Sequence, residues 1–251
     1  MIRWIQVICL LCFIMLSFSA HSTNIQPTFL DMTAVGRQSS AFLRIANSAA
    51  RPVPVEIVVS HLELGPNGEQ HIEPGGDEDF LIFPPQALVG PNATQVFRIQ
   101  WLGEPDIAES RSYIFSVNQL PVQLPEGITG IQLLYSFSVL VTVAPGDGSP
   151  DLELADASLV RDDDGDLRPK ISLVNHSNVH GYLSRSQLSL VARSQDGSTV
   201  WSETLTPEQI GTRVGLGLMQ PGALRHFTLP FSIGPEASTL EVDFRYVDRR
   251  R

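Results

Sequence analysis

The chain has 251 residues, of which 43% are hydrophobic and 18% are charged, with 27 acidic residues against 17 basic ones. This length is enough for one large domain or two of ordinary size, and the composition excludes a disordered or collagen-like protein. The formal net charge is −10, and no basic cluster is larger than the terminal Arg249–Arg251. Because phosphates need rows of lysine and arginine, these features exclude a nucleic-acid-binding protein.

The N-terminal segment, residues 1–22, has the pattern of a secretory signal peptide. One basic residue, Arg3, precedes an apolar run from Val7 to Leu16, and small residues follow this run. We predict that the peptide is cleaved within residues 20–23. The alternative is an uncleaved N-terminal anchor, and both interpretations place the rest of the protein outside the cytoplasm.

Both cysteines, Cys9 and Cys12, lie inside this predicted signal peptide. The mature chain would therefore contain no disulfide and no cysteine for a metal site or a catalytic nucleophile. A bilayer-spanning helix needs about 20 consecutive apolar residues, and no later stretch of the sequence provides them. We expect no stable membrane insertion after cleavage.

Apolar residues alternate with polar ones through much of the mature sequence, which is the pattern of half-buried strands. The alternation is clear over residues 53–59, 97–101, 112–117 and 240–246. Turn signals rich in Gly, Pro, Asn and Asp separate these runs. No long segment shows a convincing helical period. The sequence therefore predicts an all-β protein built of sandwiches.

The strongest break in the sequence is the segment 144–150, in which no apolar residue stands between Pro145 and Pro150. It predicts two immunoglobulin-like β-sandwich domains, over residues 23–145 and 150–251. The segments 42–48 and 170–176 resemble each other weakly, because each is an alternating run that ends in Asn and leads into a turn. Since this pattern is common in β proteins, it is only weak support for two related halves.

The most informative stretch runs from Ile131 to Val143, where every odd position holds a large apolar residue. A strand of this length is more than twice the usual length of about five or six residues. It is either an ordinary last strand that covers a sandwich core, or a strand that extends beyond its own partner and pairs with another protein. An exposed apolar edge left without such a partner would aggregate. Periodicity alone leaves both interpretations open.

The sequence favours neither a catalytic site nor a metal site. The acidic segment 161–166 lacks the ligand spacing of a calcium loop, and a hairpin turn explains it better. His176 and His180 are four positions apart, but the segment has the composition of a turn and not of the helix that would bring them together. No motif combines a nucleophile, a base and an oxyanion donor. We expect no enzymatic activity, no metal and no other cofactor.

An ordered series of segments resembles the PapD-like periplasmic chaperones of chaperone-usher pilus assembly. The series consists of Phe83–Pro85, Leu88–Ile99, Arg111–Val117, Leu120–Val122 and the long alternating stretch that precedes Pro145. The resemblance implies two immunoglobulin-like domains in a boomerang arrangement, which fold, cap and deliver pilus or fimbrial subunits to an outer-membrane usher. It also implies a periplasmic location and a cis peptide bond before Pro84.

In this family, the long strand of the chaperone completes the unfinished sandwich of the subunit by donor-strand complementation. The resemblance places four side chains of the long strand in the pockets of the subunit: Ile131, Leu133, Tyr135 and Phe137. It leaves open whether the free form self-associates to hide this strand.

The resemblance departs from the better-known members at the anchor of the subunit's C-terminal carboxylate. Those members use an Arg on the first strand and a Lys near the end of the long strand, but here the two places fall near Ala34 and Leu140. In this respect the sequence is more similar to the archaic or alternative subclass of the family. Carboxylate capture still needs a cation, and the candidates, in order of preference, are Arg111, Arg98 and Arg37.

The alternative from another functional class is a secreted two-domain immunoglobulin-like adhesin or fibre subunit. Such a protein would self-assemble or bind glycan, and it would not need an overlong strand for donation.

Overall fold

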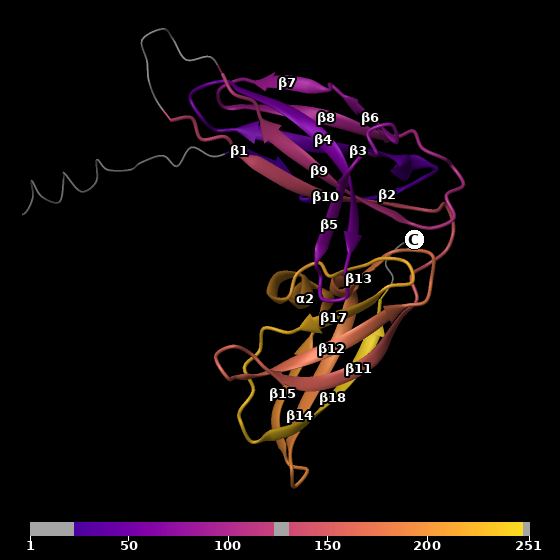
Figure 1. Ribbon diagram of the computed structural model, residues 1–251, viewed down its shortest axis with the longest axis vertical. Helices are drawn as coiled ribbons and strands as arrows, with labels where there is room; N and C mark the ends of the chain where they lie inside the picture. Colours follow the sequence, from indigo (N-terminus) through magenta and orange to yellow (C-terminus); the bar gives the residue numbers. More distant parts are fainter. Residues whose placement is uncertain (1–22, 123–130, 248–251) are drawn as a thin grey trace, which may run out of the picture.

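The computed structural model describes residues 23–122 and 131–247, so the predicted signal peptide lies outside the described residues. The described chain forms two β-sandwiches that meet at an angle (Figure 1). Strands β1 to β10 build the N-terminal sandwich, and strands β11 to β18 build the C-terminal one. The prediction of an all-β protein with two immunoglobulin-like domains in a boomerang arrangement is confirmed. Within the described residues, no helix has the length and apolar character to cross a bilayer.

The N-terminal sandwich contains ten strands and one short 3-10 turn, η1 (Arg37–Ser39). The strands are β1 (Thr23–Gln26), β2 (Phe29–Thr33), β3 (Ser40–Asn47), β4 (Val53–Leu64), β5 (Gln70–Pro74), β6 (Phe80–Phe83), β7 (Gln86–Val89), β8 (Ala93–Trp101), β9 (Arg111–Gln119) and β10 (Ser136–Ala144). One sheet has the order β1-β3-β8-β6, and we call it sheet A. The other, sheet B, has the order β2-β10-β9-β4-β5, with β7 paired to β4.

The first part of the chain contributes a strand to each sheet. β1 pairs with β3 in sheet A, and after Pro27 the chain crosses to sheet B, where β2 runs parallel to β10. The peptide bond before Pro27 is cis, and so is the bond between Phe83 and Pro84. The second bond lies where the chain leaves β6 of sheet A for β7, which pairs with β4 of sheet B.

The core of the N-terminal sandwich lies between the two sheets and is centred on aromatic rings. Phe80 makes edge-to-face contacts with Trp101, Tyr113 and Phe115, with ring centroids 4.9 to 5.1 Å apart. Such contacts add to the burial of apolar area. The alternation seen in the sequence over 97–101 and 112–117 therefore does place its apolar residues inside.

The C-terminal sandwich contains eight strands, a 3-10 turn η2 (Leu183–Arg185) and the helix α2 (Pro207–Arg213). The strands are β11 (Leu152–Arg161), β12 (Leu167–Asn175), β13 (Gly181–Tyr182), β14 (Ser186–Ser194), β15 (Thr199–Leu205), β16 (Leu218–Met219), β17 (Leu224–Thr228) and β18 (Ala237–Tyr246). The acidic segment forms the turn between β11 and β12, where Asp162 accepts backbone hydrogen bonds and pairs with Arg168.

The short helix α2 was not predicted from the sequence. It spans two turns, and only Ile210 among its residues is buried, so it has too few residues to show an apolar period. The signal that could have revealed it is local. Thr206 and Gln209 form a reciprocal capping box, and Pro207 stands at the first helical position.

The weak resemblance between segments 42–48 and 170–176 corresponds to a structural feature that the two sandwiches share. Asn47 ends β3 and Asn175 ends β12, and both side chains are buried. The Asn47 amide donates to the carbonyls of Arg51, Val89 and Gly90. The Asn175 amide donates to the carbonyls of Val179, Met219 and Gln220. In each sandwich, one asparagine ties the end of a strand to the following turn and to a distant segment.

We expect Asn175→Ala to lower the free energy of unfolding of the protein by about 2–4 kcal/mol, because several buried carbonyls lose their donor at once. Urea unfolding followed by far-UV circular dichroism measures the change. Asn24→Ala, on the exposed side of β1, is the control and should have a negligible effect. Equal stability of the Asn175 variant and the parent would contradict this role.

Candidate functional site

The N-terminal half of β10 is a sheet edge that is covered on one side only. β9 pairs with β10 from Ser136 to Val143, but β2 pairs with β10 only from Leu140 onwards. The carbonyl of Thr28 accepts a hydrogen bond from the Leu140 amide at 3.2 Å, so the edge closes there. Within the described residues, the segment of β10 before Leu140 has a strand neighbour on the β9 side alone.

Residues 131–135, the described residues that precede β10, belong to no strand, so the regular strand is shorter than the alternation from Ile131 to Val143 suggests. The reason is a lack of partners, because β9 ends at Gln119. Its last backbone contact with the segment before β10 is the hydrogen bond from the Gln119 amide to the Tyr135 carbonyl, at 3.0 Å. Apolar side chains in this segment are strongly exposed, at 94% for Ile131, 73% for Leu133 and 56% for Tyr135.

The exposed apolar side chains continue the row of β10 that faces the core. Val139, Val141 and Val143 are fully buried in the N-terminal sandwich, and Phe137 packs partly against the same core. Two positions earlier at each step come the exposed Tyr135, Leu133 and Ile131. Because side chains two apart along an extended chain share a face, the core-facing row runs on beyond the end of the chain's own sandwich.

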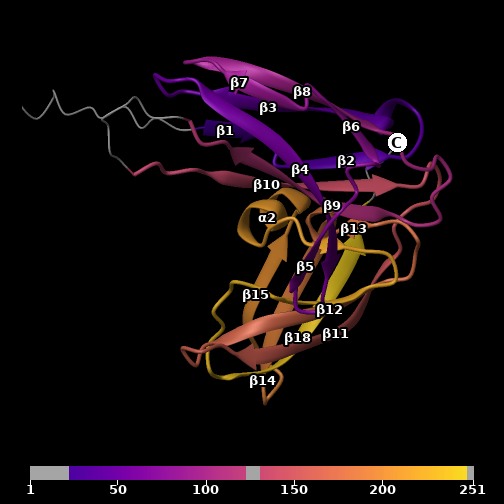
Figure 2. The same cartoon turned by 45° about the horizontal axis from the view of Figure 1, so that its top comes forward.

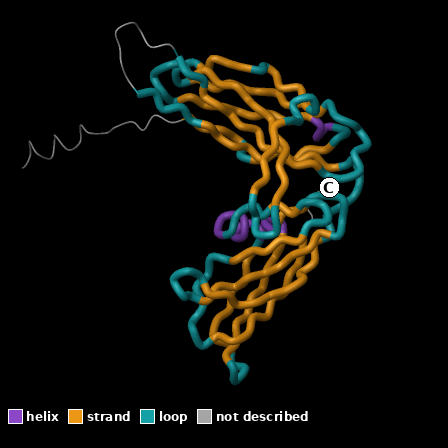
Figure 3. Tube along the Cα trace, in the orientation of Figure 1, coloured by secondary structure: helices purple, strands orange, loops and turns teal. Residues whose placement is uncertain are grey.

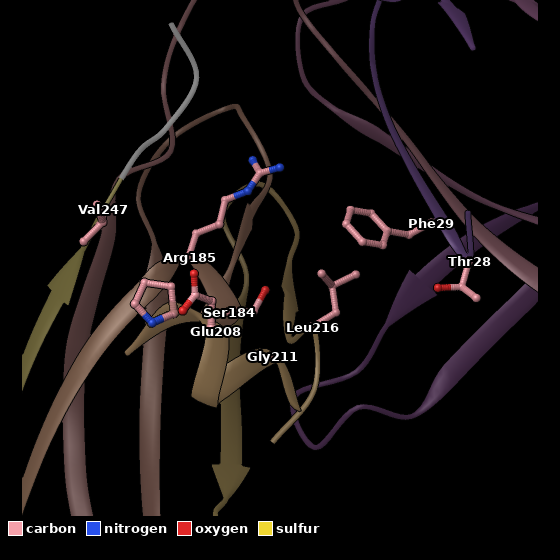
Figure 4. A pocket seen from close by; sticks show the side chains of 9 residues that line it. Thr28, Phe29, Ser184, Arg185, Glu208, Gly211, Leu216 and Val247 are labelled. Atoms are coloured by element: carbon pink, nitrogen blue, oxygen red, sulfur yellow. The ribbon is translucent and has the colours of Figure 1, made fainter. Parts of the chain in front are cut away.

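A pocket of about 630 Å³ lies between the two sandwiches, at the point where β2 closes the edge of β10. Thr28 and Phe29 of the N-terminal sandwich form one wall. The other wall comes from η2, α2 and the neighbouring chain, and Figure 4 shows the Arg185 side chain extending from it towards the side of Phe29. The C-terminal sandwich contributes these residues to the second wall: Ser184, Arg185, Pro207, Glu208, Gly211, Leu216 and Val247.

Arg185 is the cation of this pocket. Its Nη2 donates to Oδ2 of Asp31 at 2.5 Å, and its guanidinium lies 4.7 Å from the centre of the Tyr182 ring. Burial alone would lower the pKa of Arg185, but the charge of Asp31 and the hydrogen bond to it outweigh burial and raise the pKa. Nη1 of Arg185 is buried and has no hydrogen-bond partner among the described residues. The site therefore has one guanidinium edge that is not used within the described part of the chain.

The two sandwiches are joined next to this pocket by buried polar contacts. The imidazole Nε2 of His180 lies 3.0 Å from Oδ1 of Asp31, so Asp31 contacts two residues of the C-terminal sandwich. Thr142 on β10 shares a buried hydrogen bond of 2.7 Å with the Tyr182 hydroxyl. The cleft wall is thus attached directly to the strand whose edge is exposed.

A long hairpin strengthens the junction. β4 and β5 extend beyond the N-terminal sandwich towards the C-terminal one, as the tube in Figure 3 shows. The Gln220 side chain accepts from the Leu64 amide at 2.8 Å and donates to the Leu62 carbonyl at 2.9 Å. Leu62 also packs in an apolar cluster with Tyr182 and Leu218. We call the β4–β5 hairpin the brace.

The three candidate anchors from the sequence lie in different places, and none of them lines the pocket. Arg111 begins β9, where its Nη1 lies 3.6 Å from Asp79 and its Nη2 lies 3.5 Å from Glu104. Arg98 is exposed on β8 in sheet A, and Arg37 is exposed in η1.

Arg185 is not among the site residues predicted from the sequence. Its position depends on how the two sandwiches meet, and it lies far along the chain from β10. The local sequence around it carries no motif that would have marked it.

No protein-family model and no curated protein matches the sequence. Solved structures match over almost the whole described chain. A chain from the chaperone-tip adhesin complex of CFA/I fimbriae biogenesis has a TM-score of 0.51 and 11% identity, covering 89% of this chain and 98% of that one. The Class 5 fimbriae chaperone CfaA has a TM-score of 0.51 and 12% identity, with 89% and 99% covered.

A third matching structure comes from Salmonella enterica. It is a chain from the complex of the SafA pilin with the SafB chaperone of Salmonella enterica, with a TM-score of 0.51 and 14% identity, covering 92% of this chain and 99% of that one. The protein thus has the two-domain immunoglobulin-like fold of the PapD-like chaperones of chaperone-usher pili.

Proposed function

We propose that the protein is a periplasmic chaperone that folds, caps and delivers pilus or fimbrial subunits to an outer-membrane usher by donor-strand complementation. The observation that carries this proposal is the apolar row from Ile131 to Phe137, which continues the core-facing side of β10 beyond its own sandwich. The fold shared with pilus chaperones supports it. We infer an archaic or alternative subclass, because neither Ala34 nor Leu140, at the two places where the better-known members have their basic anchors, is basic.

The energy for capping comes from burial and strand pairing, so the proposed activity needs no enzyme chemistry and no cofactor. Burying a large apolar side chain contributes about 1.5–3 kcal/mol. Ile131, Leu133 and Tyr135 are the exposed members of the row, and a client groove would bury them. The uncovered edge of β10 before Leu140 provides backbone groups for the client's own strand.

The geometry of the edge also favours a direction for the client. β2 runs parallel to β10, so a client strand that runs parallel to β10 would be collinear with β2 and would end beside Thr28. Its C-terminal carboxylate would then lie at the pocket of Arg185. We propose Arg185, the arginine that lines this pocket, as the anchor, ahead of Arg111, whose two nitrogens already face carboxylates.

Co-expression tests the proposal as a whole. We expect the mature chain, purified from the periplasm with an affinity tag, to carry an equimolar small exported protein encoded beside it, and to remain monomeric with that partner. A chain that polymerises by itself, or that binds glycan and captures no such protein, would instead be an adhesin or fibre subunit.

A further inference from the structure

The pocket between the two sandwiches has little positive charge for a site that is to hold a carboxylate. Among the described residues that line it, only Arg185 and Glu208 are charged. The Arg185 guanidinium is already balanced by Asp31, which it contacts at 2.5 Å. Glu208 is exposed in the first turn of α2, and within the described part of the chain no cation forms an ion pair with it. With histidines counted as neutral, these three groups leave one negative charge in excess.

The nearest other ion pair does not correct this excess. α2 lies at the end of the C-terminal sandwich that is turned towards the N-terminal one, so Glu208 is at the junction (Figure 2). Arg213, in the last turn of α2, pairs with Glu203 and adds no net charge. Because like charges repel, a carboxylate captured by Arg185 alone would bind against the net charge of its surroundings.

The sequence supplies positive charge directly after the wall of the pocket. β18 pairs with β14, and Val247, the residue after β18, lines the pocket. The Val247 amide donates to the Arg185 carbonyl at 2.8 Å, so the backbone at this point is attached to the cation of the pocket. Asp248 and then Arg249–Arg251 follow in the sequence, outside the described residues. These three arginines are the largest basic cluster of the chain.

The distance along the chain keeps this cluster close to the pocket. One residue spans at most about 3.6 Å, so the Cα atom of Arg249 lies within about 7 Å of the Cα atom of Val247. Salt screens charges over about 8 Å at physiological ionic strength, so Arg249 acts on the pocket from within the screening length. Together with Asp248, the cluster adds a net charge of about two positive units, which reverses the sign of the excess.

We propose that Arg249–Arg251 act together with Arg185 in capturing the C-terminal carboxylate of a client. This inference rests on the proposed function, because it concerns the same pocket and the same ligand. The two parts have different tasks. Arg185 is held by Asp31 and Tyr182 and determines where the carboxylate lies, and the basic cluster supplies the excess of positive charge that favours an anion there.

The test compares the mature chain with a tail variant that combines Arg249→Ser, Arg250→Ser and Arg251→Ser. The probe is the C-terminal segment of the co-purified subunit, synthesised with a free carboxylate and as its amide. We expect the tail variant to bind the carboxylate peptide about tenfold more weakly at low salt, because one exposed ion pair contributes up to about fivefold and the cluster offers more than one. The amide peptide should bind equally to both proteins. Isothermal titration calorimetry at two salt concentrations measures the affinities.

Two further variants separate local charge from other effects. Glu208→Gln, introduced into the tail variant, should restore the affinity for the carboxylate peptide by about threefold, because it removes the unbalanced negative charge of the pocket. A control variant lowers the net charge of the chain equally at three exposed positions that do not line the pocket, and it should bind like the parent. It combines Arg44→Ser, Arg51→Ser and Arg161→Ser.

Equal binding of the carboxylate peptide by the parent and the tail variant would overturn the inference, and so would an equal loss with the amide peptide or with the control variant. Tighter binding by the tail variant would overturn it as well, because the cluster would then cover the pocket and compete with the client. In each of these cases the parent still binds the peptide, so the proposed function stands. A parent that captures no subunit, or binds neither peptide, would instead contradict the proposed function and this inference with it.

Discussion

Leu133→Arg and Tyr135→Arg are each expected to abolish the recovery of soluble subunit from the periplasm while the chaperone itself stays folded. Both side chains are largely exposed in the free protein, so arginine is tolerated there. In the complex, the same arginine would have to enter an apolar pocket, and burying an unpaired charge costs several kcal/mol. Subunit yield after co-expression and affinity purification measures the effect.

Leu134→Arg is the matched control, because it makes the same substitution at a half-exposed leucine on the opposite face of the chain. We expect it to retain most of the subunit. Circular dichroism and urea unfolding should show all three variants folded. Undiminished yield with Leu133→Arg, or equal loss with Leu134→Arg, would show that the row does not enter client pockets.

Arg185→Ala is expected to weaken the complex with the subunit by about tenfold to a hundredfold, the range for losing one charged hydrogen bond. The loss should disappear when the client strand is supplied as a peptide with a C-terminal amide in place of the carboxylate. This double-mutant cycle separates anchoring from a structural role, because Arg185 also pairs with Asp31 across the domain junction. Isothermal titration calorimetry measures the four affinities.

The same cycle with Arg111→Ala is the competing test. Arg111 already contacts Asp79, which also accepts from the Tyr113 hydroxyl at 2.6 Å. Burial and the hydrogen bond to Asp79 raise the pKa of Tyr113, so this is a packed structural network. We expect Arg111→Ala to weaken carboxylate and amide peptides equally. Selective loss of the carboxylate peptide with Arg111→Ala would identify Arg111 as the anchor.

The sequence was informative wherever alternation decided which face of a strand is buried. Val139, Val141 and Val143 are buried as their period requires, and both sandwiches follow from such runs. Where the strand begins was not predictable, since β10 starts at Ser136 because β9, its partner there, ends at Gln119. Arg185 could not be found either, because its nearness to Thr28 results from the angle between two domains. α2 was missed although its capping box is visible in the sequence.

The brace has a consequence for how the two sandwiches depend on each other. Leu62 and Leu64 belong by sequence to the first sandwich, yet Gln220 of the second satisfies their backbone and Tyr182 packs against Leu62. Separating the halves between β10 and β11 would expose this apolar cluster and leave the Gln220 side-chain amide without its two hydrogen-bond partners. The halves are therefore not interchangeable modules. A homologous second domain grafted onto this first domain would have to bring its own equivalent of Gln220 and Tyr182.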